Sequence, residues 1–317
     1  MSIKILSVAK AVPETTITND QLSEFLDTND EWISTRTGIK TRHICTTETL
    51  LDLCVEAVED AISKANIDKS EIDAVICSTL VGDYLTPSLS CGICEKLDII
   101  CPAFDINAAC SGFIYALDIA SAYIDTGRAS NILIVCAEKM SKIVDWEDRS
   151  TCVLFGDGAA ACLVTKGTAL KNIQLTTKGN SSILNLPVDN GNCPFREKEA
   201  AGFLYMQGQE VFKFAVSMIV SQSERILSDL NMTPEDIDYY VLHQANKRII
   251  DFARMKLKQE PEKFPMNVDK YGNTSSASIP ILLEEMISDG RIKPGTRLLL
   301  SAFGAGLTTG ICVIEWE

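Results

Sequence analysis

The chain has 317 residues, of which 46% are hydrophobic and 23% are charged, a composition typical of a globular protein with a large core. Its 29 basic and 43 acidic residues give a net charge of −14, which argues against nucleic-acid and anionic-membrane partners. The N-terminal residues lack the apolar stretch of a signal peptide, and 12 cysteines are too few for a disulfide scaffold of this length. We therefore expect a cytoplasmic protein with reduced thiols.

Apolar runs alternate with helical periodicity along the chain, in an order that predicts an α/β protein with buried strands. The predicted strands cover residues 74–77, 103–106, 132–136, 162–164, 240–242, 297–301 and 311–314. The predicted helices cover residues 50–65, 111–124, 210–230, 247–257 and 276–287. The longest uncharged stretch includes the last two strands. It is short for a membrane span and contains glycines, so we interpret it as two core strands joined by a glycine turn.

Three short motifs recur in the same order in the two halves of the chain. The pairs are Glu71-Ile72-Asp73 with Asp236-Ile237-Asp238, Gly127-Arg128 with Gly290-Arg291, and Phe155-Gly156-Asp157-Gly158 with Phe303-Gly304-Ala305-Gly306. The shorter spacing of the last pair indicates an insertion over residues 139–153. We predict a duplication, with halves at 1–167 and 168–317. Counting back 18 residues from Arg128 reaches Cys110, and counting back 18 from Arg291 reaches Asn273. The two residues are therefore expected at equivalent helix N-termini.

Cys110 is the best candidate for a reactive thiol. Small residues surround it, and a helix N-terminus offers N–H groups and a positive dipole end that favour a thiolate. The alternative is an inert buried cysteine. Four other cysteines lie within apolar strand runs and are expected to be inert, namely Cys77, Cys136, Cys162 and Cys312.

Two polar residues of the second half are candidates for the same site. His243 ends a predicted strand and is one of only two histidines, the other being His43, which we expect on the surface. The end of a strand is a usual place for catalytic groups in α/β folds, although a structural histidine is the alternative. Asn273 lies in a Gly-Asn turn, and its alternative is ordinary turn chemistry.

Two motifs imitate binding sites. The glycines of Gly156-Asp157-Gly158 resemble a dinucleotide fingerprint, but a strand follows them where a helix is required. Cys91 and Cys94 have CxxC spacing, but no second pair follows at the distance of a zinc ribbon. We expect two core thiols there, and no metal site.

Five motifs share their residues and their order with one enzyme family. They are Ala108-Ala109-Cys110-Ser111-Gly112, Phe155-Gly156-Asp157-Gly158, His243-Gln244-Ala245-Asn246, Gly272-Asn273-Thr274-Ser275 and Phe303-Gly304-Ala305-Gly306. With them the chain resembles β-ketoacyl-acyl carrier protein synthase III over residues 3–316. The resemblance implies the thiolase fold, an α/β fold with duplicated halves in a five-layered αβαβα arrangement, and a homodimer.

The resemblance also implies an acyltransferase that starts type II fatty acid biosynthesis by a decarboxylative Claisen condensation. Cys110 takes the acyl group from an acyl-CoA, and malonyl-acyl carrier protein then loses carbon dioxide and attacks it to give 3-oxoacyl-acyl carrier protein. His243 and Asn273 are expected to donate to the enolate oxygen, and the backbone N–H groups of Cys110 and Gly306 to the acyl oxyanion. Coenzyme A thioester is a substrate, and no cofactor is expected.

Two other functions fit parts of this pattern. Papain-type cysteine peptidases have Cys, His and Asn in this order, but their local cysteine signature and a secretion signal are absent. A related thiolase-fold acyltransferase or ketosynthase of secondary metabolism, with a different acceptor, is the more serious alternative.

Binding residues follow from the same resemblance. Coenzyme A is expected at Trp32, Arg36, Arg149 and Asn246, with the adenine between Trp32 and Arg149. Basic residues near His243 predict a docking face for the acidic carrier protein. They are Arg248, Lys247, Arg254 and Lys256, with Lys213 added from the preceding helix.

Thr86 departs from the family pattern. Acetyl-using relatives carry a phenylalanine there, which crosses the dimer interface and blocks the acyl pocket. The smaller threonine predicts donors that are longer or more branched than acetyl, unless residues 189–205, which align poorly with the family, or a side chain of the partner subunit refill the space.

Overall fold

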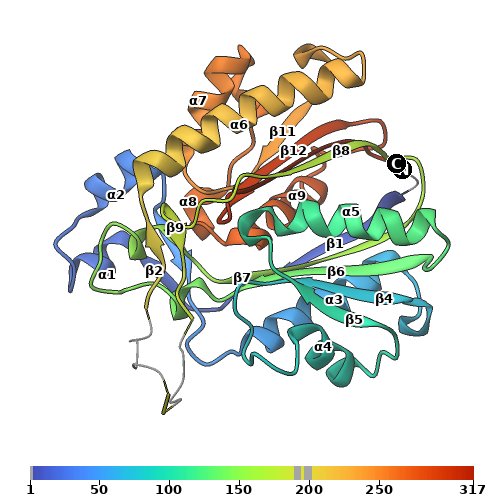
Figure 1. Cartoon of the computed structure of the whole chain (residues 1–317), viewed down its shortest axis with the longest axis horizontal. Helices are drawn as coiled ribbons and strands as arrows, with labels where there is room; N and C mark the ends of the chain where they lie inside the picture. The colour runs from blue at the N-terminus through green and yellow to red at the C-terminus, as the bar shows by residue number, and fades with distance from the viewer. Residues whose placement is uncertain (1–2, 189–193, 196–201) are drawn as a thin grey trace.

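The protein consists of five alternating layers of helices and β-sheets (Figure 1). A computed structural model describes residues 3–188, 194–195 and 202–317. From one outer face to the other, the layers are α3 (Leu50–Ala65) with α4 (Leu89–Leu97), a first sheet, α5 (Gly112–Asp125) with α9 (Ser278–Ser288), a second sheet, and α6 (Gly208–Asp229) with α7 (Lys247–Leu257). Most of the segment 189–205, which we expected to affect acyl specificity, lies outside the described residues.

The first sheet contains five strands. β4 (Ala74–Ser78) pairs in parallel with β5 (Ala103–Ile106) at one edge and with β6 (Asn131–Glu138) on its other side. From β6 the sheet continues antiparallel through β7 (Gly158–Lys166) to β1 (Ile3–Ala11). The side chains of β4 are all buried, as expected for a strand with a helix layer on each face.

The second sheet repeats this pairing with four strands. β11 (Tyr239–Leu242) pairs in parallel with β12 (Arg297–Gly304), and the sheet continues antiparallel through β13 (Thr308–Glu315) to β8 (Leu170–Thr177). The order β4-β6-β7-β1 thus corresponds to β11-β12-β13-β8. The matching topology supports the predicted duplication.

Capping residues explain where the main helices begin. Thr49 and Asp52 form a capping box at α3, Ser88 accepts the Cys91 N–H at α4, and Asn246 accepts the Arg248 N–H at α7. The remaining elements are short: β2 (Thr16–Thr18), α1 (Asn19–Ser23), α2 (Asp30–Thr37), β3 (Thr41–His43), β9 (Leu184–Asn185), β10 (Tyr205–Met206), α8 (Val268–Tyr271), and the 3₁₀ turns η1 (Lys69–Glu71), η2 (Ala109–Ser111), η3 (Met140–Lys142), η4 (Cys152–Leu154), η5 (Pro234–Asp236), η6 (Pro261–Lys263) and η7 (Ser275–Ala277).

Every strand and helix predicted from the sequence is present, and the uncharged C-terminal stretch forms β12 and β13. The structure also contains β1 and β8, which the apolar pattern does not reveal. Charged side chains such as Lys4, Lys10 and Lys171 interrupt the apolar residues of these two strands. Pairing with their neighbours, rather than their own periodicity, makes them strands.

The duplication places Cys110 opposite Ser276 rather than opposite Asn273. Ala109 and Ser275 both have a φ of +49° and immediately precede Cys110 and Ser276, and the two helices begin two residues later. The expected equivalence with Asn273 is wrong because α5 has 14 residues and α9 only 11. Counting back across helices of unequal length therefore gives the wrong partner.

The insertion predicted in the first half is present. Residues 139–157 join β6 to β7, whereas residues 305–307 join β12 to β13. The two Phe-Gly segments, however, are not structural equivalents. Phe155 lies before β7 and forms an isolated bridge with Asn273, whereas Phe303 lies within β12 and pairs with Thr309.

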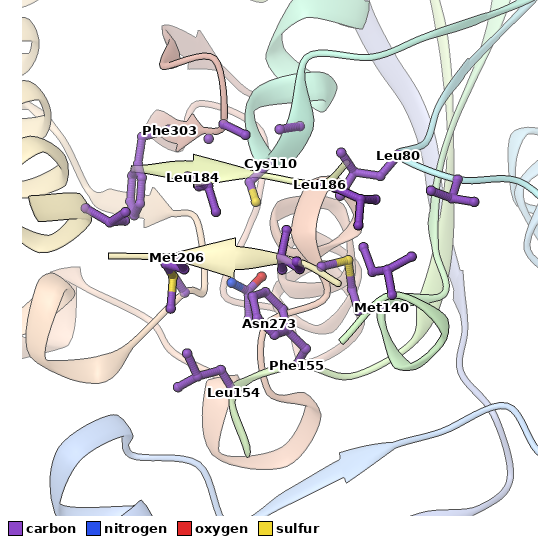
Figure 2. A pocket seen from close by; sticks show the side chains of 18 of the residues that line it. Leu80, Cys110, Met140, Leu154, Phe155, Leu184, Leu186, Met206, Asn273 and Phe303 are labelled. Atoms are coloured by element: carbon purple, nitrogen blue, oxygen red, sulfur yellow. The ribbon is translucent and has the colours of Figure 1, made fainter. Parts of the chain in front are cut away.

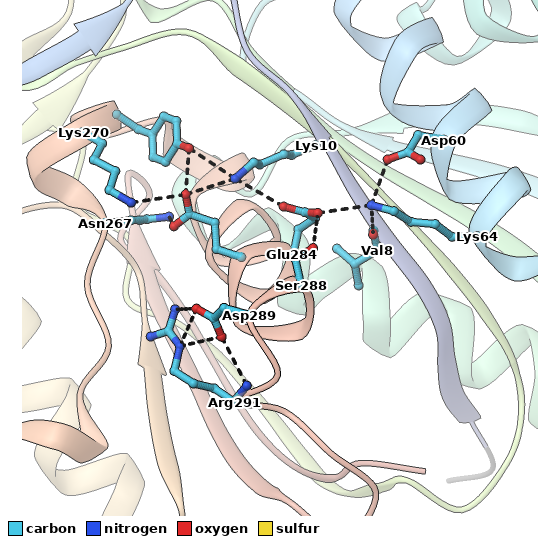
Figure 3. Close-up of polar contacts among 12 residues, drawn as sticks. Val8, Lys10, Asp60, Lys64, Asn267, Lys270, Glu284, Ser288, Asp289 and Arg291 are labelled. Carbon is cyan, nitrogen blue, oxygen red and sulfur yellow. Dashed lines mark hydrogen bonds and ion pairs between the residues drawn. The ribbon is translucent and has the colours of Figure 1, made fainter.

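A network of charges joins α9 of the second half to β1 and α3 of the first (Figure 3). Lys10 Nζ lies 3.2 Å from Glu284 Oε2 and 3.0 Å from Glu285 Oε1. Lys64 Nζ lies 3.1 Å from the other oxygen of Glu284, and the Tyr271 hydroxyl donates to Glu285 at 2.8 Å. Because Tyr271 stands two residues before Asn273, the network also supports the loop that carries this candidate residue.

Candidate active site

A cavity of about 1940 Å³ is lined by residues of both halves, including all three predicted catalytic residues. Cys110 lies in η2 just before α5, His243 follows β11, and Asn273 precedes η7 and α9. Figure 2 shows the Cys110 sulfur and the Asn273 amide facing the same space. The fold thus brings together three residues that lie far apart in the sequence.

The Cys110 thiol has a pKa above its ordinary value. Burial raises the pKa of Cys110 to about 12, a hydrogen bond from the Ser275 side chain lowers this pKa, and the charge of Glu138 raises it. Burial therefore outweighs the hydrogen bonds that favour the Cys110 thiolate. The thiolate has to be stabilised as the sulfur attacks.

The other cysteines that the sequence placed in strands are buried, as predicted. Burial raises the pKa of each of them: Cys77, Cys136, Cys162 and Cys312. The CxxC pair behaves differently from our prediction of two core thiols. Cys91 is exposed, and its sulfur accepts a hydrogen bond from the Ser88 hydroxyl, while Cys94 is half-buried.

His243 is a neutral imidazole at the floor of the site. It is 2% exposed, and burial lowers its pKa to about 3. Its Nδ1 lies 2.7 Å from Ser278 Oγ, which also accepts the Gln244 N–H at 3.4 Å. The Ser278 oxygen can accept the Gln244 N–H while its hydroxyl donates, and we assign the hydroxyl hydrogen to His243 Nδ1. The ring proton is then on Nε2, where it can serve as a donor.

The Asn273 amide is held in one orientation. Its Oδ1 accepts the Ser275 N–H at 2.8 Å, so its Nδ2 remains available as a donor to the cavity. Its backbone N–H donates to the Leu154 carbonyl at 2.8 Å, and its carbonyl accepts the Gly156 N–H at 3.2 Å. Asn273 is therefore a preorganised hydrogen-bond donor beside the nucleophile.

Glycine at position 304 leaves room for the nucleophile's backbone. A Cβ at this position would lie 2.7 Å from the Cys110 nitrogen and 2.9 Å from the Ala109 Cβ, so a side chain would collide with the start of η2. Gly306, which was predicted to supply the second oxyanion donor, also lines the cavity and has a φ of +136°. The geometry is compatible with the expected pair of backbone donors.

The residues expected to bind coenzyme A meet at the cavity mouth. The guanidinium groups of Arg36 and Arg149 lie 4.8 Å and 5.3 Å from the centroid of the Trp32 ring. Arg149 also pairs with Asp27. Asn246 caps α7 through its Oδ1 and donates from Nδ2 to the Arg36 carbonyl at 3.2 Å, so it positions this group of residues.

The predicted docking residues differ in their availability. Arg248 and Lys213 are exposed and line the cavity mouth, although Lys213 Nζ also lies 2.8 Å from Glu210. Lys247 and Lys256 are exposed on α7. Arg254 is half-buried and donates to the Gln259 carbonyl at 3.3 Å, so it is turned away from solvent and stabilises the end of α7.

Thr86 does not line the cavity of its own chain. It is exposed, and the neighbouring Tyr84 and Leu85 reach the lining while it does not. The cavity wall is mostly apolar and includes Phe155 and Phe303 of the motifs. The other apolar side chains were not identified by the motifs: Leu80, Met140, Leu154, Leu184, Leu186 and Met206. His43 lies outside this lining, half-buried, with its ring 5.4 Å from that of Tyr271.

The described residues contain neither a candidate metal site nor a candidate membrane-spanning helix. No group of three or more His, Cys, Asp or Glu side chains within residues 3–188, 194–195 and 202–317 is arranged to hold a metal ion. Within the same ranges, each helix is too short or too polar to cross a bilayer.

Comparisons with known proteins agree with the geometry. The family described as 3-oxoacyl-[acyl-carrier-protein (ACP)] synthase III matches residues 104–179, and its C-terminal family matches residues 227–316. The β-ketoacyl-[acyl-carrier-protein] synthase III of Clostridium acetobutylicum is 44% identical, over 99% of this chain and 99% of its own.

Solved structures show the same relationship. The crystal structure of 3-oxoacyl-[acyl-carrier-protein] synthase III from Aquifex aeolicus has a TM-score of 0.92 at 41% identity, covering 99% of this chain and 100% of its own. The crystal structure of the priming β-ketosynthase from the R1128 polyketide biosynthetic pathway has a TM-score of 0.94 at 31% identity. It covers 100% of this chain and 96% of its own. The fold is the thiolase fold, and the chain belongs to the 3-oxoacyl-[acyl-carrier-protein] synthase III family.

Proposed function

We propose that Cys110, His243 and Asn273 catalyse the condensation of an acyl-CoA with malonyl-acyl carrier protein. The protein is a β-ketoacyl-acyl carrier protein synthase III, an acyltransferase that initiates type II fatty acid biosynthesis. The observation that carries the assignment of roles is the convergence of a thiol and two oriented donors on one apolar cavity.

In the loading step, Cys110 Sγ attacks the thioester carbon of acyl-CoA. The carbonyl oxygen becomes an oxyanion, which the backbone N–H groups of Cys110 and Gly306 stabilise. The carbon–sulfur bond to coenzyme A then breaks, coenzyme A leaves as the thiol, and the acyl group remains on Cys110. The N-terminus of α5 favours the negative charge that develops on the sulfur during the attack.

In the condensation step, the bond between the malonyl methylene carbon and its carboxylate breaks, and carbon dioxide leaves. The electron pair forms an enolate, whose oxygen accepts hydrogen bonds from His243 Nε2 and Asn273 Nδ2. The enolate carbon then attacks the acyl group on Cys110, and the thiolate leaves. An apolar, dry wall strengthens these hydrogen bonds because little water competes for the oxygen.

Intact-mass measurement tests this sequence of steps. The protein is incubated with a panel of acyl-CoA donors, and the acyl mass on Cys110 is recorded before and after malonyl-acyl carrier protein is added. Discharge with release of carbon dioxide and formation of 3-oxoacyl-acyl carrier protein supports the proposal. Discharge to an acceptor without carbon dioxide release would identify the alternative acyltransferase, which the curated relatives do not favour.

Coenzyme A is proposed to bind at the mouth formed by Trp32, Arg36 and Arg149. The indole offers a stacking surface for adenine, and the two guanidinium groups suit phosphate. Since Arg149 already covers the Trp32 ring at 5.3 Å, it has to swing aside to admit the adenine between them.

The malonyl-acyl carrier protein is proposed to dock where Arg248 and Lys213 line the mouth, with Lys247 and Lys256 exposed on α7. We expect Arg248→Glu to raise the KM for malonyl-acyl carrier protein several-fold, with acyl-CoA loading nearly unchanged, because a carboxylate repels the acidic partner. Steady-state kinetics with each substrate measure this effect. It should weaken as salt rises, since exposed charges are screened over about 8–10 Å near physiological ionic strength.

Arg225→Glu is the matched control for this prediction. Arg225 is also exposed and lies on α6, about 18 Å along the helix from Lys213. The same charge reversal there should leave the kinetics with carrier protein unchanged. Normal carrier-protein kinetics of Arg248→Glu at low salt would remove this residue from the docking face.

A homodimer is proposed to form along β5. This strand is an edge of the first sheet, and the loops at the two ends of α4 expose Leu85 and Ile100 at 97% and 94%. A second copy of the chain would cover such an edge and its apolar flanks. We further propose a division into halves at residues 1–167 and 168–317, a cytoplasmic location, and no nucleic-acid or membrane partner.

The proposed dimer gives Thr86 a role in the neighbouring cavity. If its loop enters the partner's acyl pocket, the missing aromatic ring leaves room for several methylene groups, each worth about 0.8 kcal/mol or nearly fourfold in binding. We expect kcat/KM for isobutyryl-, hexanoyl- or octanoyl-CoA to equal or exceed that for acetyl-CoA. Thr86→Phe should restore a preference for acetyl-CoA. A wild-type profile that falls steeply beyond acetyl-CoA would mean that other side chains refill the space.

A further inference from the structure

Glu138 is a buried carboxyl beside the catalytic residues, and the condensation described above does not use it. It ends β6 and is 1% exposed. Its Oε1 accepts hydrogen bonds from the Ser276 hydroxyl at 2.6 Å and the Ser275 hydroxyl at 3.1 Å. Its Oε2 accepts the Leu80 N–H at 2.9 Å. One carboxyl therefore links the cavity wall at Leu80 to the turn that follows Asn273.

Ser275 connects Glu138 to two catalytic groups. Its backbone N–H donates to Asn273 Oδ1 at 2.8 Å, and its side chain is close enough to Cys110 to lower the pKa of that thiol. The backbone of Ser275 has a φ of +49°, a conformation that a side-chain-bearing residue keeps only where its surroundings hold it. Because a serine hydroxyl has a single hydrogen, it can donate to Glu138 or to Cys110 but not to both.

We propose that Glu138 is a positioning residue that decides which way the Ser275 hydroxyl points and thereby how readily Cys110 becomes a thiolate. An ionised Glu138 accepts the Ser275 hydrogen, so that the Cys110 sulfur lacks this donor and faces a nearby negative charge. A neutral Glu138 donates its own hydrogen to a serine oxygen, and Ser275 is then free to donate to the sulfur. Ser276 can redirect its hydrogen to the Ser78 carbonyl, 3.3 Å away.

The charges around Glu138 are compatible with both states. Burial raises the pKa of Glu138 to about 7, although the four surrounding hydrogen bonds lower it. The charge of Glu138 raises the pKa of four thiols, namely Cys54 on α3, Cys77 on β4, Cys136 on its own strand, and Cys110. The adjacent Lys139 donates to the Glu48 carbonyl at 3.2 Å. No described cationic side chain forms an ion pair with Glu138.

The direction of the pH effect follows from these contacts. As the pH rises through about 7, Glu138 ionises, and its charge together with the lost Ser275 donor raises the pKa of Cys110. The ionised Glu138 thus opposes formation of the Cys110 thiolate in the pH range where a free cysteine begins to ionise. Glu138→Gln keeps the side chain neutral. The Leu80 N–H requires the Gln carbonyl on its side, so the Gln NH₂ faces the serines. It gives up the 3.4 Å bond from the Ser276 N–H but donates to the serine oxygens, which leaves the Ser275 hydrogen to Cys110.

The test measures the rate at which iodoacetamide alkylates Cys110 as a function of pH, by mass spectrometry of the Cys110 peptide. We expect Glu138→Gln to raise this rate at about pH 8 by about tenfold or more, because nearby charges shift pKa values by one unit or more. Ser275→Ala should lower the rate below about pH 7, where a neutral Glu138 leaves the Ser275 hydrogen to Cys110. In the Glu138→Gln background it should remove most of the gain at about pH 8. The inference rests on Cys110 as the proposed nucleophile, but alkylation requires neither acyl-CoA nor carrier protein.

Asp157→Asn is the matched control. Asp157 is also fully buried and accepts hydrogen bonds from the Ser141 hydroxyl and the Cys45 N–H, yet it does not contact Cys110. It should leave the alkylation profile of Cys110 unchanged. If Glu138 has a purely structural role, Cys110 should be alkylated more slowly in Glu138→Gln. That result overturns the proposal. A shift of the Cys110 alkylation profile in Asp157→Asn equal to that in Glu138→Gln overturns it as well. If Glu138→Gln does not fold, unchanged alkylation below about pH 7 in Ser275→Ala overturns it.

Discussion

Cys110→Ala will abolish loading from acyl-CoA, with a loss on the order of 10⁴-fold or more, the scale on which enzymes lose activity without their nucleophile. The physical reason is that Cys110 alone among the described cysteines lines the cavity and stands at the N-terminus of a long helix. Intact-mass measurement after incubation with acyl-CoA, followed by peptide mapping, checks both the loss and the site of acylation.

Cys91→Ala is the control for this result. Cys91 is the exposed cysteine of α4, so it is accessible to reagents, but it is remote from the cavity lining. Its replacement should leave loading unchanged. Acyl mass on another cysteine in the Cys110→Ala variant would contradict the assignment of the nucleophile, and with it the proposed mechanism.

Much of the fold could be predicted from the sequence because local signals and burial agree. The helices at 50–65 and 247–257 have the predicted ends, since a capping residue precedes each and a residue with positive φ, Asn66 or Lys258, ends it. The equivalence of Cys110 and Asn273 could not be predicted, because it depends on the lengths of α5 and α9. The strands β1 and β8 depend on pairing across the sheet, which periodicity does not report.

The candidate catalytic residues could be identified because each lies within a short motif. The residues that orient them could not. Ser278 acts on His243 from another element, and Glu138 reaches Ser275 across 137 positions of sequence. The one signal available was the serine-rich run at 275–278, which reads as an ordinary turn until the fold places it between the nucleophile and the buried carboxyl.

His243→Ala and Asn273→Ala will each lower the condensation rate by about 10²–10³-fold, the usual cost of removing one oxyanion donor. Loading of Cys110 should suffer much less, because the acyl oxyanion is held by backbone N–H groups that neither substitution removes. The two half-reactions are measured separately, as acyl exchange between coenzyme A and Cys110, and as release of carbon dioxide from malonyl-acyl carrier protein.

The control is His43→Ala, which removes the other histidine of the chain at a position outside the cavity lining. Both half-reactions should keep their rates in this variant. Ser278→Ala offers a further comparison, since it leaves the imidazole in place but removes the hydroxyl that orients Nδ1. We expect it to slow release of carbon dioxide less than His243→Ala does. Equal losses in loading and in decarboxylation for His243→Ala would contradict the role of this residue as an enolate donor, since that role is confined to the second step.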